Sequence, residues 1–273
     1  MSDDLSQETI SAALATRYLG RNLIYLDVTT SSQDRARQEA LAGAPEGTTI
    51  VADSQTSGHG RFQRSWVSPP GSDIYMSLIL RPGPAELLKL NMVASLAVVR
   101  AVRQTTGLEA RIKWPNDVQI GGRKLSGMMI DASLTGDRPD FAILGIGLNV
   151  RLDPLDHREI AEIATSLFRE LGTDPGRLNI LIALLGEIER LYDTVKAGHS
   201  LLQNWKRSLI TLGQNVRVTW PGDPAKDIFE EGVAEDVDEE GALLLRKQDG
   251  SLARMVAGEV SLREWPPPLG GVL

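Results

Sequence analysis

Residues 113–131 read Lys-Trp-Pro-Asn-Asp-Val-Gln-Ile-Gly-Gly-Arg-Lys-Leu-Ser-Gly-Met-Met-Ile-Asp. Short runs of apolar and β-branched residues flank Gly121-Gly122, and a glycine pair in that position is a strong signal for a two-residue β-hairpin turn. Pro115 has no N–H and is excluded from a central strand, so we expect residues 113–117 at a strand entrance or a bulge. The stretch therefore predicts a hairpin in which Lys124 begins the returning strand.

This hairpin groups four features that suit ligand binding. It carries the amide of Asn116, the carboxylate of Asp117, the ammonium of Lys124 and a bare backbone at Gly127. Together they fit an anionic or phosphorylated ligand with a divalent cation nearby. A surface hairpin of ordinary turn polarity contains the same residue types, so the segment alone leaves both interpretations open.

A second polar stretch is residues 55–66, Gln-Thr-Ser-Gly-His-Gly-Arg-Phe-Gln-Arg-Ser-Trp, which follows a predicted strand over 48–52. It lacks the later glycine and the Lys-Ser/Thr ending of nucleotide-binding fingerprints, so it is neither a dinucleotide motif nor a P-loop. Its backbone amides and the guanidinium of Arg61 can close on an oxyanion, and Trp66 can cover an apolar ligand or stack on a base. The stretch predicts a mobile binding loop.

These two stretches carry a family resemblance. Together with Gly145-Ile146-Gly147-Leu148-Asn149 and the terminal run 258–263, Gly-Glu-Val-Ser-Leu-Arg, they follow the order and spacing of biotin protein ligases. The chain resembles that family from about Tyr25 onward. The resemblance implies an α+β fold, with a central mixed or antiparallel sheet and flanking helices as in class II synthetases, followed by a small SH3-like β-barrel. It implies a catalytic domain over residues 1–212 and the barrel over residues 213–273.

The resemblance also implies an activity. In the family, ATP activates biotin to biotinyl-5′-AMP with the help of Mg²⁺, and biotin then passes to a lysine of a biotin carboxyl carrier protein. Both nucleophiles come from the substrates, so no nucleophilic protein side chain is needed. We expect Lys124 and Arg61 to be the catalytic cations, because they offset the repulsion between carboxylate and phosphate. Asp117, with Asn116, is expected to help position Mg²⁺.

By the same resemblance, a Ser-Thr-Asn segment of the family contacts the ureido ring of biotin, and here it reads Ser31-Ser32-Gln33, which departs at the third position. Local sequence gives the two serines another role, as helix caps and turn residues. Gln55 matches a glutamine that faces the same ring, and a site built to satisfy a urea rejects ligands without one. The expected biotin-binding residues are Ser31, Ser32, Gln33, Gln55, Gly58, His59, Arg61, Lys124 and Gly127.

The predicted strand 141–150 contains Gly145 and Gly147, which leave one face without side chains. Room for a flat ligand and tight sheet packing explain this equally well. In the family this strand lines the nucleotide pocket. The expected residues for ATP or the adenylate are Arg61, Arg64, Trp66, Lys113, Asn116, Gly145, Asn149 and Arg263.

One residue of the loop departs from the family. Many relatives have arginine where this chain has His59. A permanent cation is thereby replaced by an imidazole, whose charge depends on pH.

Composition narrows the function classes. Of the 273 residues, 42% are hydrophobic, which is enough for a sizeable core. The formal net charge of −7 makes general nucleic-acid binding a poor match. There is no cysteine, so disulfides and thiol chemistry are excluded. No apolar run approaches the roughly 18 residues that cross a bilayer, and no signal peptide is visible. We expect a cytoplasmic protein with no membrane or nucleic-acid partner.

Only residues 1–21 precede the first predicted strand, too few for the helix-turn-helix domain of some relatives, so a ligase-only form is expected. The oligomeric state is not readable, and a homodimer stays open.

Periodicity predicts the remaining elements. Helices are expected over residues 6–19, 35–42, 86–104, 157–171, 177–197 and 201–209, and further strands over 22–28 and 74–80. Short runs from residue 213 onward predict the barrel strands 216–220, 227–234, 243–246, 253–256 and 260–263. The acidic residues between 230 and 240 are expected to form a solvated face.

Two other functions remain open at this level. A lipoate or octanoate ligase or transferase would share the fold, although the hydroxyl segment, Gln55 and the arginine loop argue against it. A non-catalytic biotin-binding module would not need Lys124 and Arg61.

Overall fold

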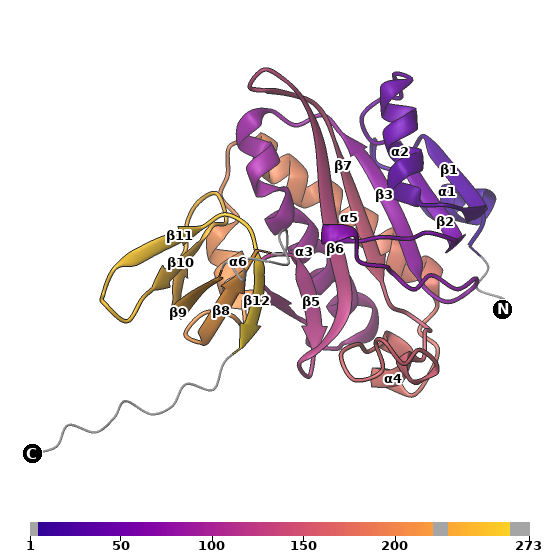
Figure 1. Ribbon diagram of the computed structural model, residues 1–273. Coiled ribbons are helices and arrows are strands. Elements are labelled where there is room, and N and C mark those ends of the chain that lie inside the picture. Colours follow the sequence, from indigo (N-terminus) through magenta and orange to yellow (C-terminus); the bar gives the residue numbers. More distant parts are fainter. Residues whose placement is uncertain (1–4, 221–228, 263–273) are drawn as a thin grey trace, which may run out of the picture.

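The computed structural model describes residues 5–220 and 229–262, which form a large mixed sheet with helices on both faces and a smaller antiparallel sheet beside it (Figure 1). The strand order of the large sheet is β1-β2-β3-β7-β6-β5-β4, and that of the small sheet is β11-β10-β9-β8-β12. The predicted α+β class is confirmed.

The central hairpin lies in the large sheet, near one edge. The strands of this sheet are β1 (Leu23–Thr29), β2 (Thr49–Gln55), β3 (Ile74–Leu80), β4 (Arg111–Lys113), β5 (Asp117–Ile120), β6 (Arg123–Thr135) and β7 (Arg138–Leu148). Only β1 and β2 pair in parallel. Gly121 and Gly122 join β5 to β6 with φ values of 56° and 80°, the left-handed pair that a type I′ hairpin requires.

The helices cover the large sheet from two sides. They are α1 (Gln7–Ala13), α2 (Ser32–Leu41), α3 (Pro84–Thr106), α4 (Leu167–Leu171), α5 (Arg177–Lys196) and α6 (Leu202–Ser208), with short 3₁₀ turns at Arg61–Gln63 and Pro154–Asp156. Within the described parts of the chain, none of the helices has the length and apolarity that crossing a membrane requires.

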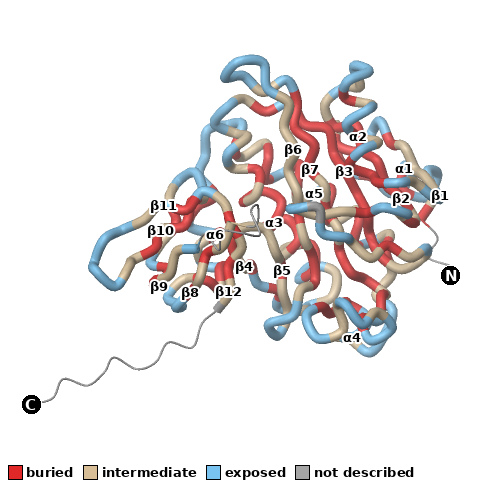
Figure 2. Tube along the Cα trace, viewed as in Figure 1, coloured by how far each residue is buried: buried red, intermediate tan, exposed pale blue. Residues whose placement is uncertain are grey.

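Side-chain alternation along the strands produces two hydrophobic cores. Ile50, Ile79 and Ile143 pack with Ala36 and Ala40 of α2. Their strand neighbours, such as Val51, Leu78 and Leu144, face the larger core that contains α3 and α5. The strands β2 and β3 and much of β7 are buried, together with the facing sides of α3 and α5, whereas β1, β5 and β6 are mostly of intermediate exposure (Figure 2). α2 covers only part of its side of the sheet, and residues of β3, β6 and β7 beside it remain open to a cavity.

The small sheet is β8 (Asn215–Thr219), β9 (Phe229–Val237), β10 (Leu243–Arg246), β11 (Leu252–Met255) and β12 (Glu259–Leu262). Its apolar residues, including Val216 and Leu243, belong to the same core as Trp114 and Trp205 of the larger part. The indole N–H of Trp114 donates to the carbonyl oxygen of Gly241 at 2.9 Å. The two sheets therefore share one hydrophobic core, and the domain boundary at residue 212 stays a prediction.

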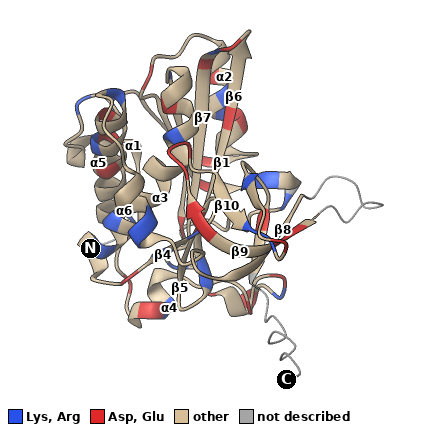
Figure 3. Ribbon diagram, turned by 90° about the vertical axis from the view of Figure 1, so that its left-hand side faces the viewer, with Lys and Arg blue, Asp and Glu red and all other residues tan. Residues whose placement is uncertain are grey.

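Acidic residues 230–240 are partly exposed, as expected, but they are paired rather than only solvated. Ion pairs at 2.6–2.7 Å join Glu230 to Lys247, Glu231 to Arg217, Glu235 to Arg246, Asp236 to Lys206 and Asp238 to Arg254. Acidic and basic segments accordingly lie together around β9 (Figure 3). Basic residues of neighbouring strands and of α6 come close only in the fold, so sequence order did not reveal these pairs.

Two predicted helices were too long. The helix expected over 6–19 ends at Ala13, because the N–H groups of Arg17, Tyr18 and Leu19 donate to the carboxylate of Glu189 instead. The helix expected over 157–171 is restricted to α4, because residues 163–165 pair with the backbone of Lys124.

Glu189 is expected to hold the amino-terminal segment on α5 in a pH-dependent way. Burial acts to raise the pKa of Glu189, but the N–H groups of Tyr18, Arg17 and Leu19 outweigh it and leave the pKa below its ordinary value. Its stabilising effect is therefore complete above the ordinary glutamate pKa of about 4.3 and is lost as the pH falls through the lower folded-state value. Glu189→Gln should lower the free energy of unfolding at pH 7 by about 2 kcal/mol.

Urea unfolding of both proteins at pH 7 and below pH 4 measures this effect, and the difference should shrink at the lower pH. Glu187→Gln on the same helix is the control. Glu187 is partly buried and pairs with Arg190 and Arg100, and burial raises its pKa. Folding therefore does not favour its charged form, and its replacement should lower the free energy of unfolding at pH 7 by less than about 0.5 kcal/mol. A difference for Glu189→Gln that is absent, or equal at both pH values, would contradict the assignment.

Candidate functional site

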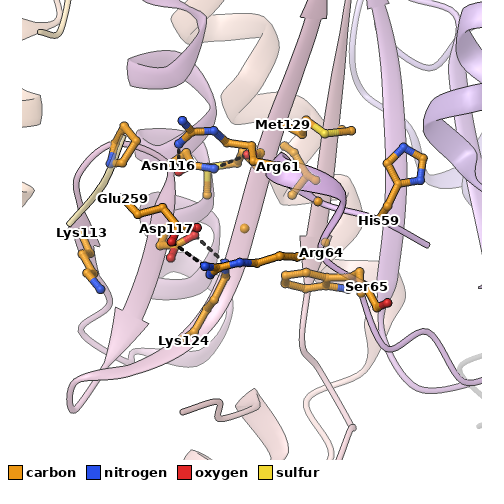
Figure 4. Close-up of a pocket in the computed structure, with 18 of the residues that line it drawn as sticks. His59, Arg61, Arg64, Ser65, Lys113, Asn116, Asp117, Lys124, Met129 and Glu259 are labelled. Carbon is orange, nitrogen blue, oxygen red and sulfur yellow. Dashed lines mark hydrogen bonds and ion pairs between the residues drawn. The ribbon is translucent and has the colours of Figure 1, made fainter. Parts of the chain in front are cut away.

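A cavity of about 500 Å³ opens between the glycine loop, the central hairpin and the edge of the small sheet. Its walls come from residues 31–33 at the start of α2, from the loop 59–66, from β6 and β7, and from the start of β12. Figure 4 shows the side chains of the loop and the hairpin turned toward one another across this space.

Three cations of the cavity are each paired with a polar partner (Figure 4). The ammonium of Lys124 lies 2.7 Å from Asp117 Oδ1, and its side chain is 33% exposed. Arg61 Nη1 donates to Asn116 Oδ1 at 2.9 Å. Arg64 Nη2 lies 2.5 Å from Glu259 Oε2 of β12. The loop and the hairpin thus bring their charges to one place, although they are distant in sequence.

Backbone pairing fixes the position of Lys124. Its N–H donates to the carbonyl oxygen of Ile163 at 2.8 Å, and its own carbonyl oxygen accepts from Thr165 N–H at 2.9 Å. On the other side, β6 pairs with β5, where a bulge lies between Val118 and Gln119. The lysine is therefore held on both sides while its ammonium stays accessible.

The side chain of Arg61 in the loop is partly buried. Burial lowers its pKa, and the nearby carboxylates of Asp117 and Glu259 act in the opposite direction. A guanidinium remains charged under such conditions, and partial burial strengthens its attraction for an anion. The next residue, Phe62, has a φ of 58°. A non-glycine residue in the left-handed region is strained, and such strain is concentrated at binding loops.

The two glycines of β7 each face a protein side chain. A Cβ on Gly147 would lie 2.4 Å from Trp66 Cε2, and a Cβ on Gly145 would lie 2.3 Å from Gln33 Oε1. Gly127 of β6 also faces the indole, at 3.0 Å from Trp66 Cζ3. Lys124 Nζ lies 5.5 Å from the centre of the Trp66 rings. Both glycines of β7 also line the cavity, so side chains pack closely on the bare strand and its role as room for a flat ligand stays a prediction.

Polar side chains line the opposite end of the cavity. Ser31 caps α2 by accepting from Asp34 N–H at 3.4 Å, and the adjacent Ser32 and Gln33 are 5% exposed. The hydroxyl groups of Ser32 and Ser77 lie 2.9 Å apart. The backbone N–H of Ser32 donates to Gln55 Oε1 at 2.8 Å. The serines therefore combine the capping role with a place in the cavity wall.

Most of the site residues expected from the sequence meet in this cavity: Ser31, Ser32, Gln33, Gln55, His59, Arg61, Arg64, Trp66, Lys113, Asn116, Asp117, Lys124, Gly127 and Gly145 all line it. Gly58 lies behind the wall, where a Cβ would be 2.7 Å from Ser68 Oγ. Asn149 is 4% exposed and donates to the carbonyl oxygen of Thr165 at 2.9 Å, so it supports the segment that holds Lys124. Arg263 lies outside the described residues.

His59 links the loop to α2. Its Nδ1 lies 3.2 Å from the carbonyl oxygen of Ser57, and its Nε2 lies 3.8 Å from Asp34 Oδ1. The imidazole is therefore near a carboxylate at the mouth of the cavity.

Sequence reasoning missed Ser77 and Glu259 as cavity residues. Ser77 is a polar residue inside an otherwise apolar strand, which is a signal that could have identified it. Glu259 belongs to a terminal run in which only Arg263 was selected. Its place opposite Arg64 follows from the docking of the small sheet, which the sequence does not encode locally.

Comparisons with known proteins define the class first. Residues 25–149 match the model of the biotin/lipoate A/B protein ligase family, and residues 211–263 match the model of the biotin protein ligase C-terminal domain. The fold and the cavity thus belong to a biotin or lipoate type of protein ligase.

Individual relatives narrow this class. The chain is 36% identical to the bifunctional ligase/repressor BirA of Bacillus subtilis over 94% of this chain and 79% of that protein. It is 32% identical to the biotin--[acetyl-CoA-carboxylase] ligase of Mycobacterium tuberculosis over 82% of this chain and 83% of that one. The structure of biotin protein ligase from Aquifex aeolicus in complex with biotin and ATP has a TM-score of 0.76 and 31% identity, covering 90% of this chain and 100% of that one. The chain belongs to the biotin protein ligase family.

Gly147→Ala is expected to displace the indole of Trp66, because the added Cβ would lie only 2.4 Å from that rigid ring. Acrylamide quenching of tryptophan fluorescence should increase relative to the unsubstituted protein. The increase should be absent when the same substitution is made in a Trp66→Phe background.

Gly186→Ala on α5 is the control, since nothing lies within 4 Å of the Cβ it adds. Unchanged quenching in a folded Gly147→Ala protein would show that the indole does not rest on Gly147.

Proposed function

We propose that this protein activates biotin with ATP to biotinyl-5′-AMP and then transfers biotin to a lysine of a carrier protein. The observation that supports this most strongly is the meeting of Lys124 and Arg61 at one cavity, each paired with a group that an anionic substrate can replace. The relatives' biotin ligase names and the biotin and ATP complex of the Aquifex protein favour the same reaction.

In the first step, a carboxylate oxygen of biotin forms a bond to the α-phosphorus of ATP. The bond from that phosphorus to the bridging oxygen breaks, and pyrophosphate leaves with the electron pair. Lys124 and Arg61 reduce the repulsion between the two anions and stabilise the charge that grows on phosphorus. The backbone pairing of Lys124 and the bond of Arg61 to Asn116 hold both cations at the cavity before the substrates arrive, so only their side-chain partners have to change.

In the second step, a neutral lysine amine of the carrier attacks the carbonyl carbon of the mixed anhydride. AMP leaves with the electron pair of the broken C–O bond. One of the two amine protons passes to solvent or phosphate, and the other remains as the N–H of the new amide. The loop 58–66 would cover the adenylate and exclude water, which otherwise hydrolyses the anhydride.

Biotin would occupy the end of the cavity that Ser31, Ser32, Gln33 and Gln55 line, with its carboxylate toward Lys124. The nucleotide would lie toward Arg64, Trp66, Lys113 and Asn116. Gly145 packs on Gln33, and its role toward the nucleotide stays a prediction. Gly58 would shape the loop behind this wall. The roles of Asn149 and Arg263 toward the nucleotide stay predictions.

The donor groups also bear on Mg²⁺. Within residues 5–220 and 229–262 there is no cluster of three carboxylate or imidazole groups suited to hold a metal. Mg²⁺ in nucleotide sites is commonly bound by one or two carboxylates and the substrate phosphates, so the carboxylate of Asp117 at the cavity fits such an ion. When bound, it would neutralise phosphate charge.

The remaining features of the proposal concern the whole protein. We infer that the small five-stranded sheet is the family's SH3-like barrel, and that the protein partner is a biotin carboxyl carrier domain. The cytoplasmic location, the homodimer and the lack of a nucleic-acid partner stay predictions.

Biotin-dependent exchange of labelled pyrophosphate into ATP tests the proposal. The protein should catalyse it with biotin but not with lipoate or octanoate. Lys124→Ala should reduce it by roughly 100- to 1,000-fold, because the developing charge loses a positioned cation, and should leave the circular dichroism spectrum unchanged.

Arg123→Ala is the matched control, since Arg123 is the exposed neighbour of Lys124 and does not line the cavity. Exchange with lipoate would favour the lipoate ligase instead. Biotin binding without any exchange would favour a non-catalytic module, and near-normal exchange by Lys124→Ala would exclude its catalytic role.

His59→Arg should retain adenylate formation and slow the release of bound biotinyl-AMP. A permanent cation beside Asp34 would hold the loop and the phosphate more firmly, by roughly three- to tenfold if one charge-assisted hydrogen bond is gained. Release is followed from purified protein loaded with labelled adenylate, with His199→Arg as a control at an exposed position. An equal or faster release would contradict this prediction.

A further inference from the structure

Ser68 is a buried residue just beyond the glycine loop, and it does not line the cavity. Its hydroxyl oxygen accepts from Gln55 Nε2 at 3.0 Å and donates to the carbonyl oxygen of Trp66 at 2.9 Å. Its main-chain carbonyl oxygen also accepts from Gln55 N–H at 3.2 Å. Ser68 is therefore bound to a cavity residue on one side and to the loop on the other.

The orientation of the Gln55 carboxamide follows from its other partner. The backbone N–H of Ser32, which can only donate, lies 2.8 Å from Gln55 Oε1. A reversed amide would place two donors against each other, so the nitrogen of the amide must face Ser68. The hydroxyl hydrogen of Ser68 is then directed to the carbonyl oxygen of Trp66.

A second series of hydrogen bonds begins at the side chain of Ser32, whose backbone N–H donates to Gln55. The hydroxyl of Ser32 donates to Ser77, because the hydroxyl hydrogen of Ser77 is directed to Gln33 Oε1 at 3.2 Å. Gln33 Nε2 in turn donates to the carbonyl oxygen of Ile143 at 3.1 Å. One end of the cavity wall is thus a directed network, and Ser68 is its connection to the loop.

The two ends of the glycine loop, at Gly58 and Trp66, meet beside the hydroxyl of Ser68 and the amide nitrogen of Gln55. The N–H of Trp66 donates to the carbonyl oxygen of Gly58 at 2.8 Å. A Cβ on Gly58 would lie 2.7 Å from Ser68 Oγ, 2.8 Å from Gln55 Nε2 and 2.9 Å from the carbonyl oxygen of Trp66. The glycine backbone therefore packs directly on the hydrogen bonds that Ser68 makes.

We propose that Ser68 is a positioning residue for biotin, which directs the Gln55 carboxamide into the cavity and ties that carboxamide to the base of the glycine loop. Gln55 Nε2 has two hydrogens. Ser68 takes one of them, and the second stays available to a carbonyl oxygen of the ligand. Without Ser68 the amide nitrogen loses its acceptor, and rotation to another one would leave the N–H of Ser32 unpaired in a buried site. The inference rests on the proposed function, because it takes biotin as the ligand.

Ser68→Ala should raise the KM for biotin in pyrophosphate exchange by about tenfold, as expected for one lost hydrogen bond in a buried polar site. The KM for MgATP should change by less than about twofold, because the nucleotide is bound by other residues. In a Gln55→Ala background the same substitution should add less than about twofold to the KM for biotin, because the effect passes through Gln55. A merely structural role would alter both KM values or persist without Gln55.

Ser54→Ala is the matched control. Ser54 is the residue before Gln55 on β2, is equally buried, and donates to the carbonyl oxygen of Asp27 at 3.0 Å, away from the network. It should leave the KM for biotin unchanged. Should Ser68→Ala fail to fold, Ser68→Cys keeps a weaker donor and acceptor of similar size and should raise the same KM by a smaller factor.

The outcomes distinguish the role of Ser68 from the proposed biotin ligase function. Normal exchange by the unsubstituted protein with equal KM values for Ser68→Ala and Ser54→Ala would overturn the role of Ser68 alone. Absence of biotin-dependent exchange in the unsubstituted protein would overturn the proposed function, and the role of Ser68 with it.

Discussion

The pairing of Lys124 with Asp117 and of Arg61 with Asn116 is the interaction on which the rest of the site depends. Each cation is held by an acceptor from the same short strand entrance. The ion pair of Lys124 lies within the hairpin, and the hydrogen bond from Arg61 to the Asn116 amide joins the glycine loop to it. Coulomb attraction between such groups is modest in water and larger in a partly closed cavity. The cavity can therefore exchange these internal partners for the oxygens of two anionic substrates.

The backbone around the cations is held in place, so replacing their internal partners with substrate oxygens costs little conformational entropy. Residues 163–165 hold the backbone of Lys124, and Asn149 holds that segment in turn. On the other side, the small sheet contributes Glu259 opposite Arg64 and accepts the indole N–H of Trp114. Cations that are positioned before the substrates arrive lose little entropy on binding, which is the condition for electrostatic stabilisation of a transition state.

Local sequence signals predicted much of this arrangement, because they report local physics. Gly121-Gly122 required left-handed backbone, β3 has the predicted bounds, and Ser31 caps α2 as expected. The motifs also named most of the cavity residues. The two helices that were predicted too long, over residues 6–19 and 157–171, have another cause. Their ends depend on partners distant in the chain, Glu189 for the first and Lys124 for the second. Ser68, Ser77 and Glu259 acquire their roles only from hydrogen bonds and ion pairs that the fold creates.

A crystal structure with a non-hydrolysable analogue of biotinyl-AMP gives the most direct measurement of the central claim. The account predicts that Lys124 Nζ and at least one Arg61 guanidinium nitrogen lie within about 3.2 Å of the oxygens on the phosphate or its acyl linkage. Lys124 still on Asp117 and Arg61 still on Asn116, with the phosphate bound elsewhere, would contradict it.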